Sequence, residues 1–273
     1  MIQDIAPHFL DNRFEPNRHP EPGDVCFCFR GRDVMISSDG VRFPTAAELA
    51  GNLHLQWLFT LDGKNVFLEN GRARPPEGYE YVNINSLRGK EQRYLVFASW
   101  TALHLAGWYA SNRYCGTCGH ATVPASDERA LDCPVCGRRI YPRIQPAVIV
   151  GVTNGDNLLM THYADRPLAS WALIAGFTEI GETFEETVAR EVKEEVNLNV
   201  KNIRYYKSQP WGIADDLLAG FYCDVDGDPT IRVDNKELRE GVWTPREKIT
   251  GQPDDYSLTN EMMMVFKAGK EPK

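Results

Sequence analysis

The stretch that decides the fold runs from Gly176 to Leu198 and reads "GFTEIGETFEETVAREVKEEVNL". It contains seven glutamates but only one arginine and one lysine. Thr183 is followed three residues later by Glu186, which is the pattern of a capping box and predicts a helix that starts near Phe184. The question is why one loop and one helix tolerate so much negative charge.

The predicted helix is amphipathic, and its acidic edge indicates a metal site. Glu191, Glu194 and Glu195 fall within about 100° of arc on a helical wheel. Arg190 is placed to pair with Glu186 or Glu194, and it cannot neutralise all three acids. A hard cation such as Mg²⁺ or Mn²⁺ would offset the repulsion, because it prefers carboxylate oxygens. On charge alone, the alternative is a solvated acidic face. The apolar stripe toward a core consists of Phe184, Val188, Val192 and Val196.

Length and charge narrow the classes of protein. The chain has 273 residues, which suffices for two or three domains, and a formal net charge of −8. This charge argues against a broad phosphate-gripping surface, since non-specific nucleic-acid binding depends on many Lys and Arg side chains. No segment has the apolar length of a signal peptide or a membrane span. The expected location is therefore cytoplasmic, with no membrane partner.

The cysteines predict one structural zinc site. Four of the seven form two CxxC pairs that are separated by fourteen residues, and each pair is followed by glycine. Four thiolates at this spacing can fill a tetrahedral zinc shell, which leaves no coordination position for substrate. The alternative is four reduced, buried cysteines. The predicted ligands are Cys115, Cys118, Cys133 and Cys136, whereas Cys26, Cys28 and Cys223 are interpreted as small buried hydrophobic residues.

Apolar runs separated by turn residues predict paired strands on both sides of the cysteine segment. The early runs are "DVCFCF", "DVMIS", "QWLFTL" and "NVFLEN", and the periodic stretch "EQRYLVFASWTALHLAGWYASN" predicts a long helix. Later runs are "AVIVGV", "LLMTHY", "IRYYKSQPW", "LLAGFYCDV" and "EGVWTP", and "LTNEMMMVFKAG" predicts a last helix. Strands around a central acidic helix favour an α/β sandwich over a doubly wound sheet. No internal repeat is visible in the sequence.

The spacing of the acidic stretch resembles the Nudix box, the metal-binding loop and helix of hydrolases that cleave nucleoside diphosphates linked to another group. The pattern is Gly176, five residues, Glu182, seven residues, and then Arg190-Glu191-Val192-x-Glu194-Glu195. One position departs from the family, because Asn197 stands where glycine is usual near the end of the box. Asparagine also adopts the left-handed conformation at a helix end, so we expect the geometry to be kept.

A closer resemblance is to the NADH pyrophosphatase subfamily, also called NAD-capped-RNA decapping enzymes. It depends on the cysteine pairs before "YPRIQPAVIV" and on "SQPW" after the box. The resemblance implies a fold of the α/β (α+β) class, with an N-terminal Nudix-like domain (1–108), a zinc ribbon (109–141) and a catalytic Nudix α/β/α sandwich (142–273). It also implies a homodimer with one structural zinc ion per subunit and catalytic Mg²⁺ or Mn²⁺.

The resemblance also assigns roles to individual residues. It implies metal ligation by Ala175, through its backbone carbonyl, and by Glu191, Glu195 and Glu240. Glu194 joins Glu191 and Glu195 as a catalytic residue, and the general base is left open between Glu194 and Glu195. The implied substrate-binding residues are Glu128, Tyr141, Phe177, Gln209, Pro210 and Trp211. Packing in the core is the alternative for Phe177 and Tyr141.

The expected activity is metal-dependent hydrolysis of the diphosphate in NADH or NAD⁺ to nicotinamide mononucleotide and AMP, with NAD-capped RNA as a further candidate substrate. After "SQPW" the subfamily continues with a proline-rich segment, whereas this chain reads "GIADD" at 212–216. That difference leaves ADP-ribose and diadenosine polyphosphates as alternative substrates. A nucleotide-sensing zinc-ribbon protein without catalysis is the non-enzymatic alternative.

Overall fold

The computed structural model describes residues 1–40, 42–49, 54–69, 71, 73–164, 171–233 and 236–273. Contacts divide the chain into two compact units. The N-terminal unit comprises Ile2–Arg143 and Gly212–Asp215, and the C-terminal unit comprises Met1, Ile144–Trp211 and Asp216–Lys273. The domain boundaries predicted at 108 and 141 stay predictions. In the described ranges no helix is long and apolar enough to cross a membrane.

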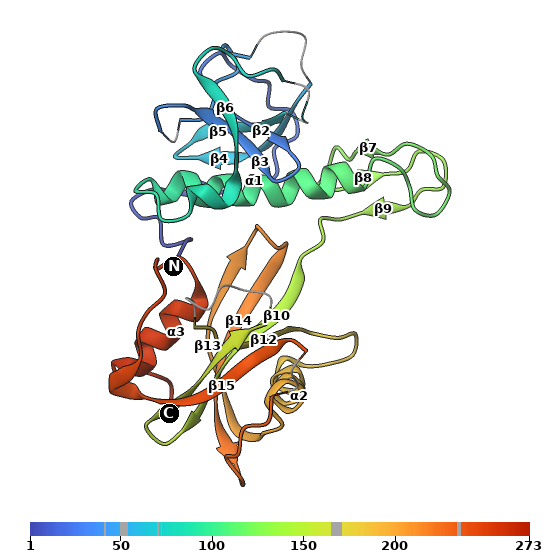
Figure 1. Cartoon of the computed structure of the whole chain (residues 1–273). Helices are drawn as coiled ribbons and strands as arrows, with labels where there is room; N and C mark the ends of the chain where they lie inside the picture. Colours follow the sequence, from blue (N-terminus) through green and yellow to red (C-terminus); the bar gives the residue numbers. More distant parts are fainter. Residues whose placement is uncertain (41, 50–53, 70, 72, 165–170, 234–235) are drawn as a thin grey trace. The chain divides into compact units, whose positions relative to one another are not determined.

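The C-terminal unit is built on a mixed sheet with the strand order β13-β14-β10-β11-β15, and β12 pairs with β10 (Figure 1). Strands β10 and β14 are parallel, and the other neighbours are antiparallel. All five strand runs predicted after the cysteines are confirmed, while β12 escaped prediction. The strands are β10 (Gln145–Asn154), β11 (Asn157–Tyr163), β12 (Ile174–Phe177), β13 (Asn199–Trp211), β14 (Asp216–Asp226) and β15 (Leu238–Pro245).

Two helices cover opposite faces of this sheet, which makes the predicted sandwich (Figure 1). Helix α2 (Phe184–Val196) packs its valines against Val148 and Val150 of β10. Helix α3 (Leu258–Lys267), preceded by the short 3-10 helix η2 (Arg246–Lys248), packs against Ala147 and Ile149. Because side chains alternate along a strand, β10 contributes residues to the hydrophobic cores on both faces of the sheet.

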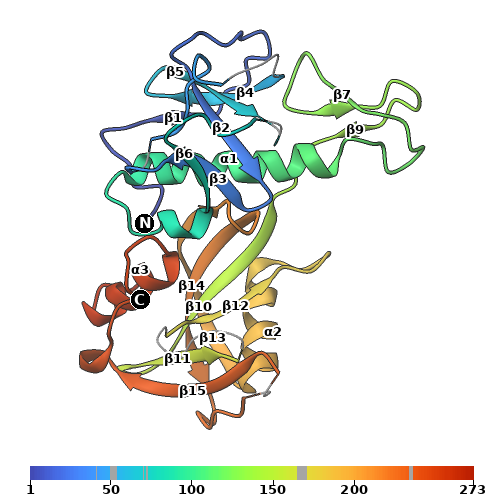
Figure 2. The same ribbon diagram turned by 45° about the horizontal axis from the view of Figure 1, so that its top comes forward.

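The N-terminal unit has its own sheet, with the strand order β1-β4-β5-β2-β3-β6. The long helix α1 (Arg93–Ser111), which the periodicity of its sequence predicted, packs against this sheet (Figure 2). The strands are β1 (Leu10–Asp11), β2 (Val25–Arg30), β3 (Asp33–Ser37), β4 (Leu55–Leu61), β5 (Lys64–Glu69) and β6 (Tyr79–Asn83), followed by the 3-10 helix η1 (Ile84–Leu87). Cys26, Cys28 and Cys223 are buried, as predicted.

The two sheets share one topology, although no repeat is visible in the sequence. The order β4-β5-β2-β3-β6 matches β13-β14-β10-β11-β15 strand for strand. The central pair is parallel in both sheets, β2 with β5 and β10 with β14, and the flanking pairs are antiparallel. Each sheet ends in a 3-10 turn and a helix, η1 with α1 and η2 with α3. The chain therefore uses one strand plan twice.

Candidate active site and zinc ribbon

Helix α2 begins and ends as its sequence predicts. Its capping box is formed, because the Thr183 hydroxyl accepts a hydrogen bond from the Glu186 backbone N–H (3.2 Å) and the Glu186 carboxylate accepts one from the Thr183 N–H (2.8 Å). At the other end, Asn197 has φ 58° and ψ 29°, which is the left-handed conformation expected of it. The helix that carries the acids is thus fixed at both ends.

Arg190 connects the helix to the loop before it. Its guanidinium binds Glu182 at 2.6 and 2.9 Å, Glu191 at 2.7 Å and Glu194 at 3.0 Å. It also donates to the backbone carbonyl of Phe177 at 2.9 Å. Of the two partners suggested by sequence, Glu194 is confirmed and Glu186 is wrong, since the Glu186 carboxylate is engaged in the capping box. One arginine thereby links the loop that contains Glu182 to Glu191 and Glu194 of the helix.

Two of the helix acids are buried, and one lies against β12. Glu191 is 8% exposed and Glu195 is 2% exposed. A Cβ atom built on Gly176 would lie 2.0 Å from the Glu191 carboxyl carbon, so only glycine leaves room for this carboxylate. Burial raises the pKa of Glu191, while the hydrogen bond from Arg190 acts in the opposite direction. The structure thus brings Glu191 next to β12, the strand that contains Ala175.

Buried carboxylates such as those of Glu191 and Glu195 are the kind of ligand that a hard divalent cation prefers. Buried carboxylates are disfavoured unless a positive charge compensates them, and Mg²⁺ or Mn²⁺ prefers carboxylate and carbonyl oxygens. Glu194 differs from the other two, because its side chain is 59% exposed and is bound to Arg190. The three acids that share one edge in the sequence therefore divide into two buried groups and one at the surface.

The structure corrects the acid expected from β15. Glu240 is exposed and pairs in register with His162, and the next pair on the same side of the two strands, Val242 and Met160, belongs to the core on the α3 face. Glu240 therefore faces away from α2. The acid of this segment whose charge raises the pKa of Glu191 is Glu237. The sequence reasoning missed it, because "KELREGVW" contains two glutamates and gives no sign of which one faces the helix.

The cysteine segment forms a small sheet, β7-β8-β9, and brings the four predicted zinc ligands together. Their Sγ atoms all lie within 4.8 Å of one another, with 3.6 Å between Cys115 and Cys136 and 3.4 Å between Cys118 and Cys133. Tetrahedral zinc with Zn–S bonds of about 2.3 Å separates the sulfurs by roughly 3.8 Å, so the cluster fits. Backbone N–H groups of Thr117 and Cys118 lower the pKa of Cys115 to about 6, which favours the thiolate. The strands are β7 (Val123–Pro124), β8 (Leu131–Asp132) and β9 (Arg139–Ile140).

Tyr141 and Glu128 lie together beside the ribbon. The Tyr141 hydroxyl donates to Glu128 at 2.8 Å, and this contact raises the pKa of Tyr141. Arg139 also donates to Glu128, at 2.6 Å. Tyr141 is 53% exposed, and Phe177 in the C-terminal unit is 52% exposed. Both aromatic rings are accessible, so packing in the core is not their role.

The "SQPW" segment is less accessible than predicted. Gln209 is fully buried, donating to the Tyr256 carbonyl at 2.8 Å and accepting from the Leu258 N–H at 2.6 Å at the start of α3. Its amide is used inside the C-terminal unit, so a direct substrate contact is not supported. Pro210 is exposed, and Trp211 is half-buried against the core on the α3 face. Of the three residues of this segment that were predicted to bind substrate, only Pro210 and Trp211 therefore have accessible surface.

The residues that follow "SQPW" are held by contacts within the protein. Residues Gly212–Asp215 belong to the N-terminal unit, where Arg32 donates to the Ile213 carbonyl at 2.9 Å. Asp215 lies 3.7 Å from the imidazole of His104. Asp216, at the start of β14, is only 8% exposed. The two acids of this loop therefore meet a basic side chain or the protein interior.

Comparison with known proteins agrees with these features. Residues 143–263 match the NUDIX domain, and residues 110–141 match the NADH pyrophosphatase zinc ribbon domain. The chain therefore contains a Nudix domain that is preceded by a zinc ribbon of this type. The Nudix domain includes α2 and its acids, and the ribbon match spans all four cysteines.

Curated relatives match about half of this chain at moderate identity. The NAD-capped RNA hydrolase NudC of Enterobacter sp. (strain 638) is 43% identical over 141 residues, which cover 52% of this chain and 54% of that protein. The protein of the same name from Shigella dysenteriae is 41% identical over 149 residues, 55% of this chain and 58% of that protein. The matched region spans about half the length of these relatives. A solved NUDIX hydrolase from Nitrosomonas europaea aligns with 58% of this chain and 92% of its own, at 20% identity and a TM-score of 0.49.

Proposed function

We propose that this protein hydrolyses the diphosphate of NADH, NAD⁺ or an NAD cap on RNA, and that a divalent cation is required. The observation that carries the proposal is the helix in which Glu191 and Glu195 are buried, with Glu191 lying beside Gly176 and accepting a hydrogen bond from Arg190. The ribbon of the NADH pyrophosphatase type supports a dinucleotide over other Nudix substrates. The curated relatives are named for hydrolysis of NAD-capped RNA.

In this proposal the buried acids near α2 form the metal site. Carboxylates of Glu191, Glu195 and Glu237, with the Ala175 carbonyl, would hold Mg²⁺ or Mn²⁺. Bound ions of this kind neutralise diphosphate oxygens and lower the pKa of a coordinated water. Water attacks one phosphorus, the bridging P–O bond breaks, and two monophosphates leave. Glu194 and Glu195 both remain candidates for the group that takes the water's proton.

The other groups of the site would serve binding and structure. Exposed rings of Phe177 and Tyr141 suit stacking on a nicotinamide or adenine ring. The ribbon zinc is assigned a structural role, because four cysteines complete its shell. A homodimer and a cytoplasmic location complete the proposal, and light scattering of purified protein tests the dimer.

A product screen tests the proposal. Purified protein with Mg²⁺ or Mn²⁺ is incubated with NADH, NAD⁺, ADP-ribose, a diadenosine polyphosphate and NAD-capped RNA, and products are identified by mass spectrometry. We expect AMP with reduced nicotinamide mononucleotide from NADH, AMP with nicotinamide mononucleotide from NAD⁺, and monophosphorylated RNA with nicotinamide mononucleotide from the capped transcript. Turnover of ADP-ribose or the diadenosine compound alone would show that the substrate is another nucleoside diphosphate derivative and not NADH or NAD⁺. No turnover of any compound would contradict catalysis.

A further inference from the structure

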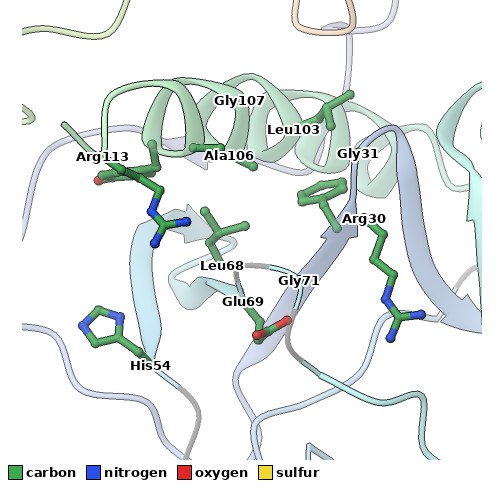
Figure 3. A pocket seen from close by; sticks show the side chains of 13 residues that line it. Arg30, Gly31, His54, Leu68, Glu69, Gly71, Leu103, Ala106, Gly107 and Arg113 are labelled. Atoms are coloured by element: carbon green, nitrogen blue, oxygen red, sulfur yellow. The ribbon is translucent and has the colours of Figure 1, made fainter. Parts of the chain in front are cut away.

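The N-terminal unit contains a cavity of about 780 Å³ that has no part in the proposed hydrolysis. It lies between the second half of α1 and the carboxyl ends of β2 and β5, and its apolar lining includes Phe29, Leu68, Leu103 and Ala106 (Figure 3). This volume lies in the range typical of small-molecule sites, and most such sites combine apolar walls with a few polar groups.

Cationic and acidic side chains surround the apolar lining. Arg113 approaches from the end of α1, and His54 and Glu69 come from the sheet side (Figure 3). Arg30 is held by the Ala73 carbonyl (3.1 Å) and by stacking over a tyrosine ring. Within the described ranges, the side chains of Arg113 and His54 form no hydrogen bond or ion pair. Both residues also line an adjoining cavity of about 330 Å³, so they lie near each other.

Gly107 gives a second indication that this space receives a ligand. Glycine is the least favourable residue in a helix interior after proline, yet Gly107 lies inside the 19-residue helix α1. A Cβ atom built there would meet nothing within 4 Å, so packing within the protein does not require glycine. Gly107 lines the cavity, and the missing side chain enlarges it.

The C-terminal unit provides a comparison, because the shared topology leaves a hollow of about 640 Å³ at the matching position. There the cation is neutralised by the protein itself, since Arg204 pairs with Asp224 at 2.9 Å and donates to the Pro272 carbonyl at 2.9 Å. The strand plan thus produces the hollow in both units. In the N-terminal cavity, by contrast, no described side chain pairs with Arg113 or His54, although the Glu69 carboxylate lines the same cavity.

We propose that the N-terminal cavity binds a small organic phosphate. The guanidinium of Arg113 and the imidazole of His54 suit a phosphate group, since arginine presents a fork of donors that matches phosphate oxygens. The apolar wall of Leu68 and Leu103 suits the ring system of the same molecule. This site is independent of the proposed hydrolysis, and it places ligand binding in a unit that carries no predicted acid of the Nudix box.

Isothermal titration calorimetry with AMP, inorganic phosphate and adenosine, without added divalent ions, tests the site. Arg113→Ala removes the phosphate contact, and Gly107→Leu fills the cavity at a position where a larger side chain meets open space. We expect AMP affinity to fall about tenfold or more in Arg113→Ala and binding at this site to be lost in Gly107→Leu. Adenosine should bind more weakly than AMP, and phosphate alone should bind weakly.

Arg18→Ala is the matched control, because Arg18 is another exposed arginine of the same unit and pairs with Glu15 outside the cavity. It should bind AMP like the wild type. Thermal unfolding and NADH turnover of Arg113→Ala and Gly107→Leu should match the wild type, which separates this site from hydrolysis and from misfolding. Equal AMP affinity in all four proteins, or no binding of AMP to the wild type, would overturn the proposal.

Discussion

The two sheets of this chain follow the same strand order, and only the C-terminal one carries the helix with the buried acids Glu191 and Glu195. In the C-terminal unit, the connection from β11 to β13 contains β12, an arginine-held loop and α2. The matching connection in the N-terminal unit runs from β3 to β4, and its described residues 38–40, 42–49 and 54 form no helix. The strand order is therefore separable from the site that we propose for hydrolysis, which lies on one loop and one helix of the C-terminal unit.

Both connections are nevertheless held by a carboxylate. Glu182 accepts hydrogen bonds from Arg190 in the C-terminal unit, and Glu48 accepts them from Arg42, Thr45 and Tyr79 in the N-terminal unit. Each interaction keeps the pKa of its carboxyl group at about 2. The two connections differ in content: the C-terminal one carries buried acids near a glycine, and the N-terminal one forms a turn.

The largest expected effect comes from removing a buried acid of α2. Glu195→Gln should lower kcat about 10²- to 10³-fold, because it removes a charge that we place at the metal site. Glu185→Gln on the first turn of the same helix is the matched control, since Glu185 is exposed. Turnover is measured with NADH, and circular dichroism checks the fold. Equal loss in both variants would contradict a specific role for Glu195.

The next largest effect distinguishes Glu240 of β15 from Glu237, the residue just before this strand. Glu237→Gln should reduce kcat about tenfold to a hundredfold, because its charge acts on Glu191. Glu240→Gln should leave kcat within about twofold, because Glu240 faces the other side of the sheet. The reverse result would restore the residue first expected from the sequence.

A smaller effect is expected from Gly176→Ala, which adds a methyl group where the Glu191 carboxylate lies. The flexible acid can move aside, so the fold should be kept, while its displacement should lower kcat about tenfold. Gly40→Ala in the N-terminal unit is the control, because a Cβ atom there meets nothing within 4 Å. Unchanged activity in Gly176→Ala would show that the position of Glu191 is not critical.

The smallest effect concerns acid stability of the N-terminal connection. The pKa of Glu48 is about 2 in the folded protein, below its ordinary value of 4.5, mainly because of the hydrogen bond from Arg42. Its stabilisation is therefore complete above about pH 4.5 and is lost as the pH falls toward 2. Glu48→Gln should lower the free energy of unfolding at pH 7 by about 1 kcal/mol or less. Urea unfolding at pH 7 and pH 2.5 measures whether the difference shrinks in acid, and a constant difference would contradict this assignment.

The sequence predicted those features that depend on near neighbours. The capping box, the Asn197 end and the two CxxC pairs are each encoded within a few residues, and all have the expected geometry. Strand β12 was missed because it has only four residues. The repeated strand order is not visible as a repeat in the sequence, because the two sheets reach it with different side chains; only the resemblance implied an N-terminal Nudix-like domain.

Features that depend on distant segments could not be predicted. Which of Glu237 and Glu240 acts on Glu191 depends on how β15 pairs with β11, a long-range contact that no local pattern reveals. The internal role of Gln209 depends on Leu258, 49 residues further along the chain. The pairing of Arg190 with Glu182 spans eight residues and a loop, so helical spacing alone did not suggest it.

Binding of Mn²⁺, followed by electron paramagnetic resonance, tests most directly whether the inserted loop and helix form the metal site. Free Mn²⁺ is measured as the ion is added to the wild type, to Glu191→Gln and to the control Glu185→Gln, all without substrate. We predict that the wild type and Glu185→Gln bind Mn²⁺ equally well and that Glu191→Gln binds it at least about tenfold more weakly. Equal binding by all three proteins would contradict a metal site at Glu191.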